Sequence, residues 1–369
     1  MKRVLIGATA LIGAQIASPA MAAEKIQLEL GGYMEQFFGG VKAIKDGNLG
    51  GGSSGFGMDR ETRVFVQGKT NLDNGITVGA HINLRAEGSN MQVNTKRQYA
   101  WMSGDFGWFG IGEQNGVVDR FAVTAPDQGG RNNHELLDWM NFAYTGAGKK
   151  GHTHRIPTLK SFIDDNSLRV MYITPSFHGF SAGVSYAPWA EVNRNSGVRV
   201  REKREGSNEV QVGVAYTGSL GEIETKWDAS LSTTIDGVDR WLYRSGLSFG
   251  YAGWTVGGAY LGTSSSESKR GNVWNGSANH IFNENLMELG ARYLFGPYGL
   301  SMTYGQNVSS QGKAMMAHAA GTYEMGPGVT LIGQLFYGES DGKINYDTGH
   351  GSSTYRNGVG AVSAILLKF

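Results

Sequence analysis

Some short motifs in the chain contain residue types that act as nucleophiles in other proteins. Ser181 lies in the stretch Gly179–Gly183, whose Gly-x-Ser-x-Gly spacing is that of a hydrolase nucleophile. That nucleophile needs a sharp turn from a strand into a helix, whereas Ser181 lies where apolar and polar residues alternate. The motif therefore indicates a strand residue, and we predict that the chain has no catalytic residue.

Other motifs resemble metal or phosphate sites. The stretch beginning at His134 resembles a zinc-protease helix, but Asp138 stands where the second histidine is needed. His152 and His154 lie in a basic, glycine-rich stretch, where solvated side chains are more typical than metal ligands. The glycine-rich run Gly50–Gly57 does not precede a predicted helix, as a phosphate-binding loop would. We predict no metal site and no cofactor.

The composition indicates the elements that must position any functional residue. The chain has 369 residues, of which 57 are glycine and 7 are proline, and 11% are aromatic. Glycine is about twice as frequent as the average of roughly 7%, which is typical of an all-β protein with many turns. The chain contains no cysteine, so it has no disulfide and no thiolate metal site.

The first 22 residues have the pattern of a secretory signal peptide. Two basic residues precede an apolar run over residues 4–14, and small residues follow it. This run is too short to cross a membrane as a helix. Cleavage after Ala22 and cleavage after Ala23 fit equally well, and residues 23–369 form the predicted mature domain.

The charge of the mature chain is close to neutral. Removing Lys2 and Arg3 from 33 basic residues leaves 31 against 32 acidic ones, a net charge of −1. Proteins that bind nucleic acid carry clusters of positive charge that neutralise phosphates. We therefore predict no nucleic-acid partner.

After the signal peptide, apolar and polar residues alternate with a period of two, as in strands with two different faces. In residues 76–87 every even position is apolar, and the odd positions are mostly polar. Seven short turns, such as Leu72–Gly75, alternate with eight longer polar connections, such as Asn115–Asn166. Fifteen connections join sixteen strands.

Aromatic residues cluster near the short turns, as they do at the membrane interface of an outer-membrane barrel. Such a sheet must close, because unpaired backbone groups are costly in hydrocarbon. A soluble sandwich would also show alternation, but the turn pattern and the aromatic residues favour a transmembrane antiparallel β-barrel of 16 strands. The aromatic residues concerned are Phe106, Trp108, Phe180, Tyr251, Trp254, Phe295, Tyr298 and Phe369.

Residues 115–166 interrupt the alternation for an unusual length. Loops this long in a compact domain are usually functional or disordered. Disorder fits poorly because the segment contains many large apolar residues, including Trp139, Phe142 and Phe162. We predict a loop that packs inside the cavity formed by the rest of the chain.

Two stretches and the last residue resemble a known family. Residues Arg97–Gly112 and Tyr172–Tyr186, which flank the long loop, and Phe369 are similar to the general porins of the Gram-negative outer membrane, alphaproteobacterial type. The likeness runs from Ile26 to Phe369, but the Pro-Glu-Phe loop motif of some enterobacterial members is absent. The resemblance implies a homotrimer in contact with outer-membrane lipid and lipopolysaccharide. It also implies that Phe369 is an assembly signal read by the barrel-assembly machinery, and that residues 115–166 are the constriction loop.

Strand alternation and the resemblance together predict the residues of the pore. The resemblance implies a basic wall that faces an acidic loop across the narrowest point. Arg97 has the opposite parity to Lys96 and is expected to point away from the lumen, near the rim, whereas Lys96 and Gln98 are expected to face it. The predicted basic wall is Arg63, Arg85, Lys96 and Arg169, the predicted loop acids are Asp119, Asp127, Glu135 and Asp138, and the other predicted lumen-facing residues are Tyr33, Glu35, His81, Asn83, Arg244 and Arg292.

These features predict a passive outer-membrane diffusion channel for ions and small hydrophilic solutes, with no chemical step. A wide barrel discriminates only where a constriction and its charges act on the solute. Residues 116–166 contain six acidic and six basic residues, so the sign of ion selectivity stays open. The alternatives are a channel selective for sugar or phosphate and an outer-membrane hydrolase on a barrel scaffold. A soluble binding module is opposed by the signal peptide and the aromatic clusters.

Overall fold

The described residues of the chain form an all-β barrel with one short helix inside it. The computed structural model describes residues 25–45, 55–86, 94–130, 139, 167–189, 207–235, 240–265, 285–309, 312–343 and 353–369. No helix in these ranges is long and apolar enough to cross a membrane. The elements are β1 (Gln27–Lys45), β2 (Gly55–Asn71), β3 (Thr77–Arg85), β4 (Asn94–Gly104), β5 (Gly107–Gln114), α1 (Val117–Arg120), β6 (Ser167–Ile173), β7 (Phe180–Trp189), β8 (Ser207–Leu220), β9 (Ile223–Thr234), β10 (Arg240–Tyr251), β11 (Trp254–Ser265), β12 (Asn285–Phe295), β13 (Tyr298–Ser309), β14 (Gly312–Gly326), β15 (Val329–Lys343) and β16 (Ser353–Lys368).

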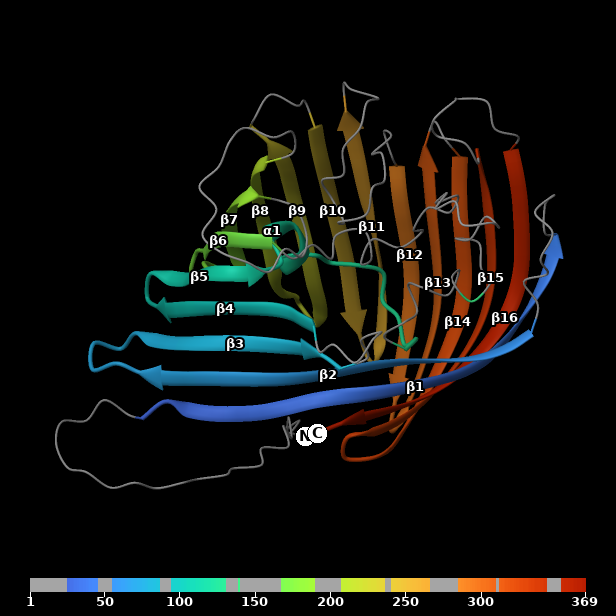
Figure 1. Ribbon diagram of the computed structural model, residues 1–369, viewed down its shortest axis with the longest axis horizontal. Helices are drawn as coiled ribbons and strands as arrows, with labels where there is room; N and C mark the ends of the chain where they lie inside the picture. Colours follow the sequence, from blue (N-terminus) through green and yellow to red (C-terminus); the bar gives the residue numbers. More distant parts are fainter. Residues whose placement is uncertain are drawn as a thin grey trace.

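The sheet closes on itself (Figure 1). Each strand pairs antiparallel with its neighbours in sequence, and β1 pairs with both β2 and β16. The last ladder ends where Gly32 and Phe369 exchange two backbone hydrogen bonds of 2.7 and 3.1 Å. The predicted antiparallel barrel of sixteen strands is confirmed.

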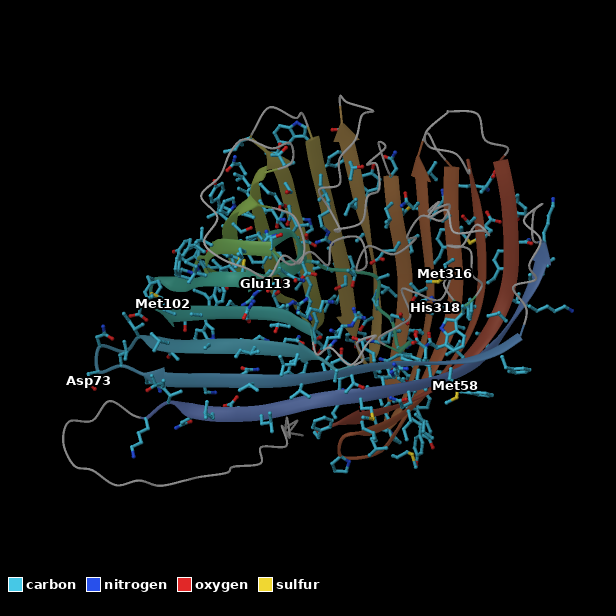
Figure 2. The ribbon with its side chains drawn as sticks, in the orientation of Figure 1. Met58, Asp73, Met102, Glu113, Met316 and His318 are labelled. Atoms are coloured by element: carbon cyan, nitrogen blue, oxygen red, sulfur yellow. The ribbon has the colours of Figure 1, made fainter. Side chains whose placement is uncertain are left out.

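The short connections are tight hairpin turns at the predicted places. Between β10 and β11, Ala252 and Gly253 have φ values of 49° and 88°. Positive φ at both central residues is what a type I′ turn requires, and this turn matches the twist of the paired strands. Asp73 marks the turn between β2 and β3 in Figure 2.

The two faces of the sheet differ as alternation predicts. On β10, Trp241, Tyr243 and Phe249 are exposed on the outer face, whereas Leu242 and Arg244 are buried on the inner face. Met58 of β2 projects outward and is 77% exposed (Figure 2). An apolar outer face around a mixed interior is typical of a barrel whose surroundings are lipid.

Aromatic side chains form a row at the short-turn end of the outer face. Trp254, Tyr293, Phe295, Tyr298 and Tyr323 stack in sequence, with ring centroids 4.6, 5.3, 5.5 and 5.1 Å apart. This row confirms the predicted clustering for β11 to β14. The assignment of Trp108 to the outer girdle is wrong, because Arg120 of α1, inside the barrel, lies 4.5 Å from its ring.

The pairing of β4 with β3 contains a β-bulge at Lys96. Asn83 of β3 pairs with Arg97, but Leu84 pairs with Thr95, so Lys96 is an extra residue without a register partner. Arg97 therefore shares the inner face with Asn83, which is 6% exposed. The predictions that Arg97 points away from the lumen and that Lys96 takes the regular lumen-facing position are wrong.

The register of β3 and β4 also places Gln98. It pairs with Ile82, which is 40% exposed on the outer face, so Gln98 also lies on the outer face. The prediction that it faces the lumen is therefore wrong.

The interior contains an apolar cluster on the four successive strands β1, β16, β15 and β14. Its largest members include Phe37, Met316 and Phe336, and Trp139 of the long loop packs against it. Met316 and His318 lie one after the other along the inner side of β14 (Figure 2). Simple alternation predicts a polar inner face, whereas this part of the wall is apolar on both faces.

Candidate functional site

A segment after β5 crosses the inner wall of the barrel. Residues 116–130 begin with α1, which contacts β7, β8 and β9, and continue across the following strands, as the teal trace after α1 shows in Figure 1. At each step a backbone N–H of the segment donates to a side-chain oxygen of an inward-facing strand residue. The pairs are Val118 N to Gln211 Oε1 at 3.0 Å, Val123 N to Asp228 Oδ1 at 2.9 Å, Ala125 N to Glu288 Oε1 at 2.7 Å and Gln128 N to Ser301 Oγ at 2.9 Å.

This pattern follows from the irregular backbone of the segment. Because the chain here forms no strand or long helix, its N–H groups need acceptors from elsewhere. The wall supplies them from four different strands, which holds the segment against the barrel along its length. We name residues 116–130 the inner segment.

Glycines on the wall allow the inner segment to lie close. A Cβ added at Gly246 of β10 would lie 2.0 Å from the carbonyl oxygen of Val123. A Cβ at Gly290 of β12 would lie 2.6 Å from the carbonyl oxygen of Pro126. Both distances are shorter than any ordinary contact, so only glycine permits this approach.

Arg244 holds the middle of the inner segment. Its Nη1 lies 2.5 Å from Asp228 Oδ2, and its Nη2 donates to the carbonyl oxygen of Val123 at 2.7 Å. The side chains of Arg244 and Asp228 have no exposed surface. Arg244 therefore faces inward, as predicted from its parity, but it binds the segment and is not open to solutes.

Arg169 has a similar place where the chain leaves β5. Its Nε donates to the carbonyl oxygen of Gln114 at 3.0 Å, and its Nη2 lies 3.6 Å from Glu209 Oε2. Its side chain has no exposed surface. Parity placed Arg169 on the correct face, but the structure does not support its predicted place on a basic wall in contact with ions.

Asp127 ties the far end of the inner segment to β13 and β14. Its Oδ1 lies 3.0 Å from Nε2 of His318 and accepts a hydrogen bond of 3.0 Å from Ser301. Burial alone would raise the pKa of Asp127, but hydrogen bonds from His318, from the Gly129 N–H and from Ser301 outweigh it and hold the pKa below its usual value. This predicted loop acid is therefore a carboxylate that contacts the wall.

The near end of the inner segment joins a group of charged and polar side chains. Asn115 accepts from Arg97 Nε at 3.0 Å and donates to Asp119. Asn115 therefore links Asp119, a predicted loop acid, to Arg97 of β4. Glu135 and Asp138, the other predicted loop acids, lie outside the described residues.

Arginines on β2 and β3 lie beside each other on the inner face. Arg63 and Arg85 are directly opposite in the register, and Arg63 Nη2 lies 3.2 Å from Glu61 Oε1. Glu61 also accepts from the hydroxyl of Tyr33. Arg85 is exposed, whereas Arg63 is 4% exposed. Arg63, Arg85 and Arg97 therefore form a basic patch on three adjacent strands, and we keep the name basic patch for these residues.

The remaining predicted lumen-facing residues also lie on the inner face. Glu35 and Asn83 are buried, and His81 is half-buried. Arg292 Nη2 donates to Thr255 Oγ1 at 3.2 Å. Sequence reasoning placed Arg97 on the wrong face, because it did not expect Tyr99 on the same strand to face inward, and it missed Arg120, which lies in the irregular segment. Their only signal in the sequence is that they flank the end of the strand pair before the long loop.

The motifs for other chemistry have no suitable geometry in the described residues. Ser181 lies inside β7, opposite Ala215, rather than at a turn into a helix. In the described part of the chain, no three His, Asp or Glu side chains gather to hold a metal ion. His134, His152 and His154 lie outside that part.

Comparisons with known proteins agree with this architecture. A family model described as Gram-negative porin matches residues 7–345. No curated protein sequence matches the chain.

Solved structures share the fold. The anion-selective porin from Comamonas acidovorans is 17% identical, with a TM-score of 0.60 over 94% of this chain and 100% of that one. OmpT, an outer membrane protein of Vibrio cholerae in its trimer form, is 10% identical, with a TM-score of 0.59 over 94% and 100%. A mutant of the Rh. blastica porin is 14% identical, with a TM-score of 0.57 over 93% and 100%. The match to the family model covers most of the chain, and the chain belongs to the Gram-negative porins.

Proposed function

We propose that the protein is a passive diffusion channel of the outer membrane for ions and small hydrophilic solutes. The observation that carries this proposal is a closed barrel with an apolar outer face and charged side chains on its inner wall. In lipid, only a closed sheet gives the backbone groups of every strand a hydrogen-bond partner. The closed sheet also leaves a route through its centre. The fold and the family are those of a channel, and we propose that the protein performs no chemical step.

We further propose that residues 115–166 narrow this route. The bonds between the inner segment and the strands from β8 to β13 support the proposal. The basic patch would form one side of the constriction, with the loop acid Asp119 joined to Arg97 through Asn115. The loop acids Asp127, Glu135 and Asp138 would form the other side. A field between opposite charges at a narrow point acts on every ion that passes.

We expect the protein to be exported, trimeric and assembled in the outer membrane. Removal of residues 1–22 and recognition of Phe369 by the barrel-assembly machinery belong to this proposal, as does contact with lipopolysaccharide. The trimer form of OmpT, which has the same fold, supports a homotrimer. The hydrogen bonds of Phe369 with Gly32 support a role of this residue in closing the barrel.

A pair of engineered cysteines tests the position of the inner segment. A Cβ at Gly290 would lie 2.6 Å from the carbonyl oxygen of Pro126 and 3.2 Å from the Cβ of Ala125. A small shift of the segment that relieves the first contact would also widen the second toward the spacing of about 3.5–4.5 Å that a disulfide needs. The natural chain has no cysteine, so the Ala125→Cys/Gly290→Cys variant is expected to form one disulfide on oxidation. Faster migration of the unfolded, unreduced protein in gel electrophoresis would reveal it.

The control pair is Ala125→Cys with Leu289→Cys, because Leu289 is 53% exposed on the outer face. This pair should not cross-link within one chain. Equal cross-linking of both pairs would contradict the proposed path of the segment.

Recordings in planar bilayers test the channel and its basic patch together. The wild-type protein should give stepwise increases in conductance. The Arg85→Ala variant should shift the reversal potential in a salt gradient toward cations, with the anion-to-cation permeability ratio falling about twofold.

Lys69→Ala is the matched control, since it removes the same charge from a side chain that lies 2.8 Å from Glu29 near the short-turn end of β2. Its shift should be smaller than that of Arg85→Ala. No conductance from the wild type would reject the channel, and an unchanged potential in Arg85→Ala would remove Arg85 from the constriction.

A further inference from the structure

A band of aromatic rings crosses the inner wall on five consecutive strands. The rings belong to Tyr33, Phe65, His81, Tyr99 and Trp108, one each from β1 to β5. Their neighbouring centroids are 5.9, 6.1, 5.2 and 6.3 Å apart. Aromatic pairs attract one another over such distances, so the rings form a continuous surface that we name the aromatic band.

Most of the aromatic band is accessible from the lumen. Tyr33 is buried at one end, but Phe65, His81, Tyr99 and Trp108 are half-buried. Large apolar surfaces in contact with water usually mark a place where something binds. The inner wall of a porin is the surface past which solutes move, so the aromatic band lies on the proposed route.

Cationic groups border the aromatic band. The exposed guanidinium of Arg120 lies over Trp108 at 4.5 Å, and Arg97 lies two residues before Tyr99 on the same face of β4. Arg63 lies two residues before Phe65 on the same face of β2. Two acidic residues lie near the band as well: Glu61 is bonded to Arg63, and Asp119 accepts from Asn115, which Arg97 also contacts. The border of the band is therefore predominantly basic.

We propose that the aromatic band is a binding strip for planar carboxylates, that is, aromatic and heteroaromatic acids, as they pass through the pore. The ring of such a solute stacks on Tyr99 and Trp108, while its carboxylate lies near Arg97 and Arg120. A neutral sugar would use the rings but not the guanidinium groups, and a phosphate ion the guanidinium groups but not the rings. A solute with a flat ring and a negative charge uses both.

This inference rests on the proposed channel function, and one pair of probes tests it separately. Benzoate and cyclohexanecarboxylate have the same charge and similar size, but only benzoate has a planar aromatic face. Each probe is added to wild-type channels in planar bilayers, and its effect is measured relative to the current of the same protein in potassium chloride. Benzoate should reduce the current at concentrations about tenfold lower than cyclohexanecarboxylate does.

Variants of the aromatic band should remove this preference. Tyr99→Leu and Trp108→Leu are expected to weaken the benzoate effect about tenfold toward the level of cyclohexanecarboxylate. Tyr251→Leu removes an aromatic residue from the outer face and should leave the preference intact. Titration of benzoate into refolded wild-type and Tyr99→Leu protein in detergent, followed by tryptophan fluorescence, measures the affinities of these two proteins without relying on conductance.

The outcomes separate the two proposals. Normal conductance with equal effects of both probes, or an unchanged benzoate affinity in Tyr99→Leu and Trp108→Leu, would overturn the binding strip while leaving the channel intact. Reduction of the current by glucose or maltose at lower concentrations than benzoate would make the band a sugar site and also overturn it. No conductance from folded wild-type protein would reject the channel, and the fluorescence titration would still decide about the strip.

Discussion

Replacing Arg244 with alanine is expected to destabilise the folded barrel by about 3–5 kcal/mol and to release the middle of the inner segment. The reason is that Asp228, whose side chain has no exposed surface, would remain as a buried charge without its partner at 2.5 Å. The hydrogen bond to the carbonyl oxygen of Val123 would also be lost. Thermal unfolding in detergent would measure the first effect, and the noise of the open-channel current the second.

Two further variants test whether the unpaired buried charge causes the loss of stability. Removing both charges in Arg244→Met/Asp228→Leu should cost less than Arg244→Ala alone, because no unpaired charge stays buried. Arg292→Ala should cost about 1 kcal/mol or less, since Arg292 is partly exposed and donates to Thr255 at 3.2 Å. If the double variant is as unstable as Arg244→Ala, the buried charge is not the cause.

Replacing Gly246 with leucine is expected to force the inner segment away from the wall. Even the first carbon of the new side chain would lie 2.0 Å from the carbonyl oxygen of Val123, and overpacking of this kind costs about 1–3 kcal/mol or more. The Val123 N–H would lose its bond to Asp228. We expect faster proteolysis within residues 116–130 and larger fluctuations of the single-channel current.

Gly333→Leu is the matched control for this substitution. Gly333 lies on the outer face of β15, and a Cβ there would meet no atom within 4 Å. This variant should resist proteolysis and conduct like the wild type. Equal proteolysis and equal conductance of the two variants would show that the close approach to Gly246 does not hold the inner segment in place.

The strands and their order were predictable from the sequence because lipid imposes a strict alternation on every membrane strand. Residues 76–87 show this directly, and the short turns fall where predicted, for example at Leu72–Gly75. Alternation fails where a strand contains an extra residue. The bulge removes the regular position of Lys96, whereas Arg97 and Gln98 lie on unexpected faces because Tyr99 of the same strand faces inward, beside His81.

The site itself was predictable only in part. Parity correctly placed Arg169 and Arg244 on the inner face, but it carries no information on what covers a side chain. Their burial depends on the path of an irregular segment, which is determined by contacts between residues distant in sequence, such as Val123 with Asp228. The glycines that permit this path, Gly246 and Gly290, cannot be told from the many other glycines of the chain.

The pairing of Tyr33 with Lys368 has a consequence for how the chain reaches its folded state. This contact joins residues separated by nearly the whole sequence, so forming it early costs much loop-closure entropy. The contact stabilises the fold only after most hairpins have formed. Hairpins of neighbouring strands can form early, whereas the first and last strands must pair late. Until these strands pair, both edges of the sheet expose unpaired backbone hydrogen-bonding groups, and the folding intermediate is prone to aggregate.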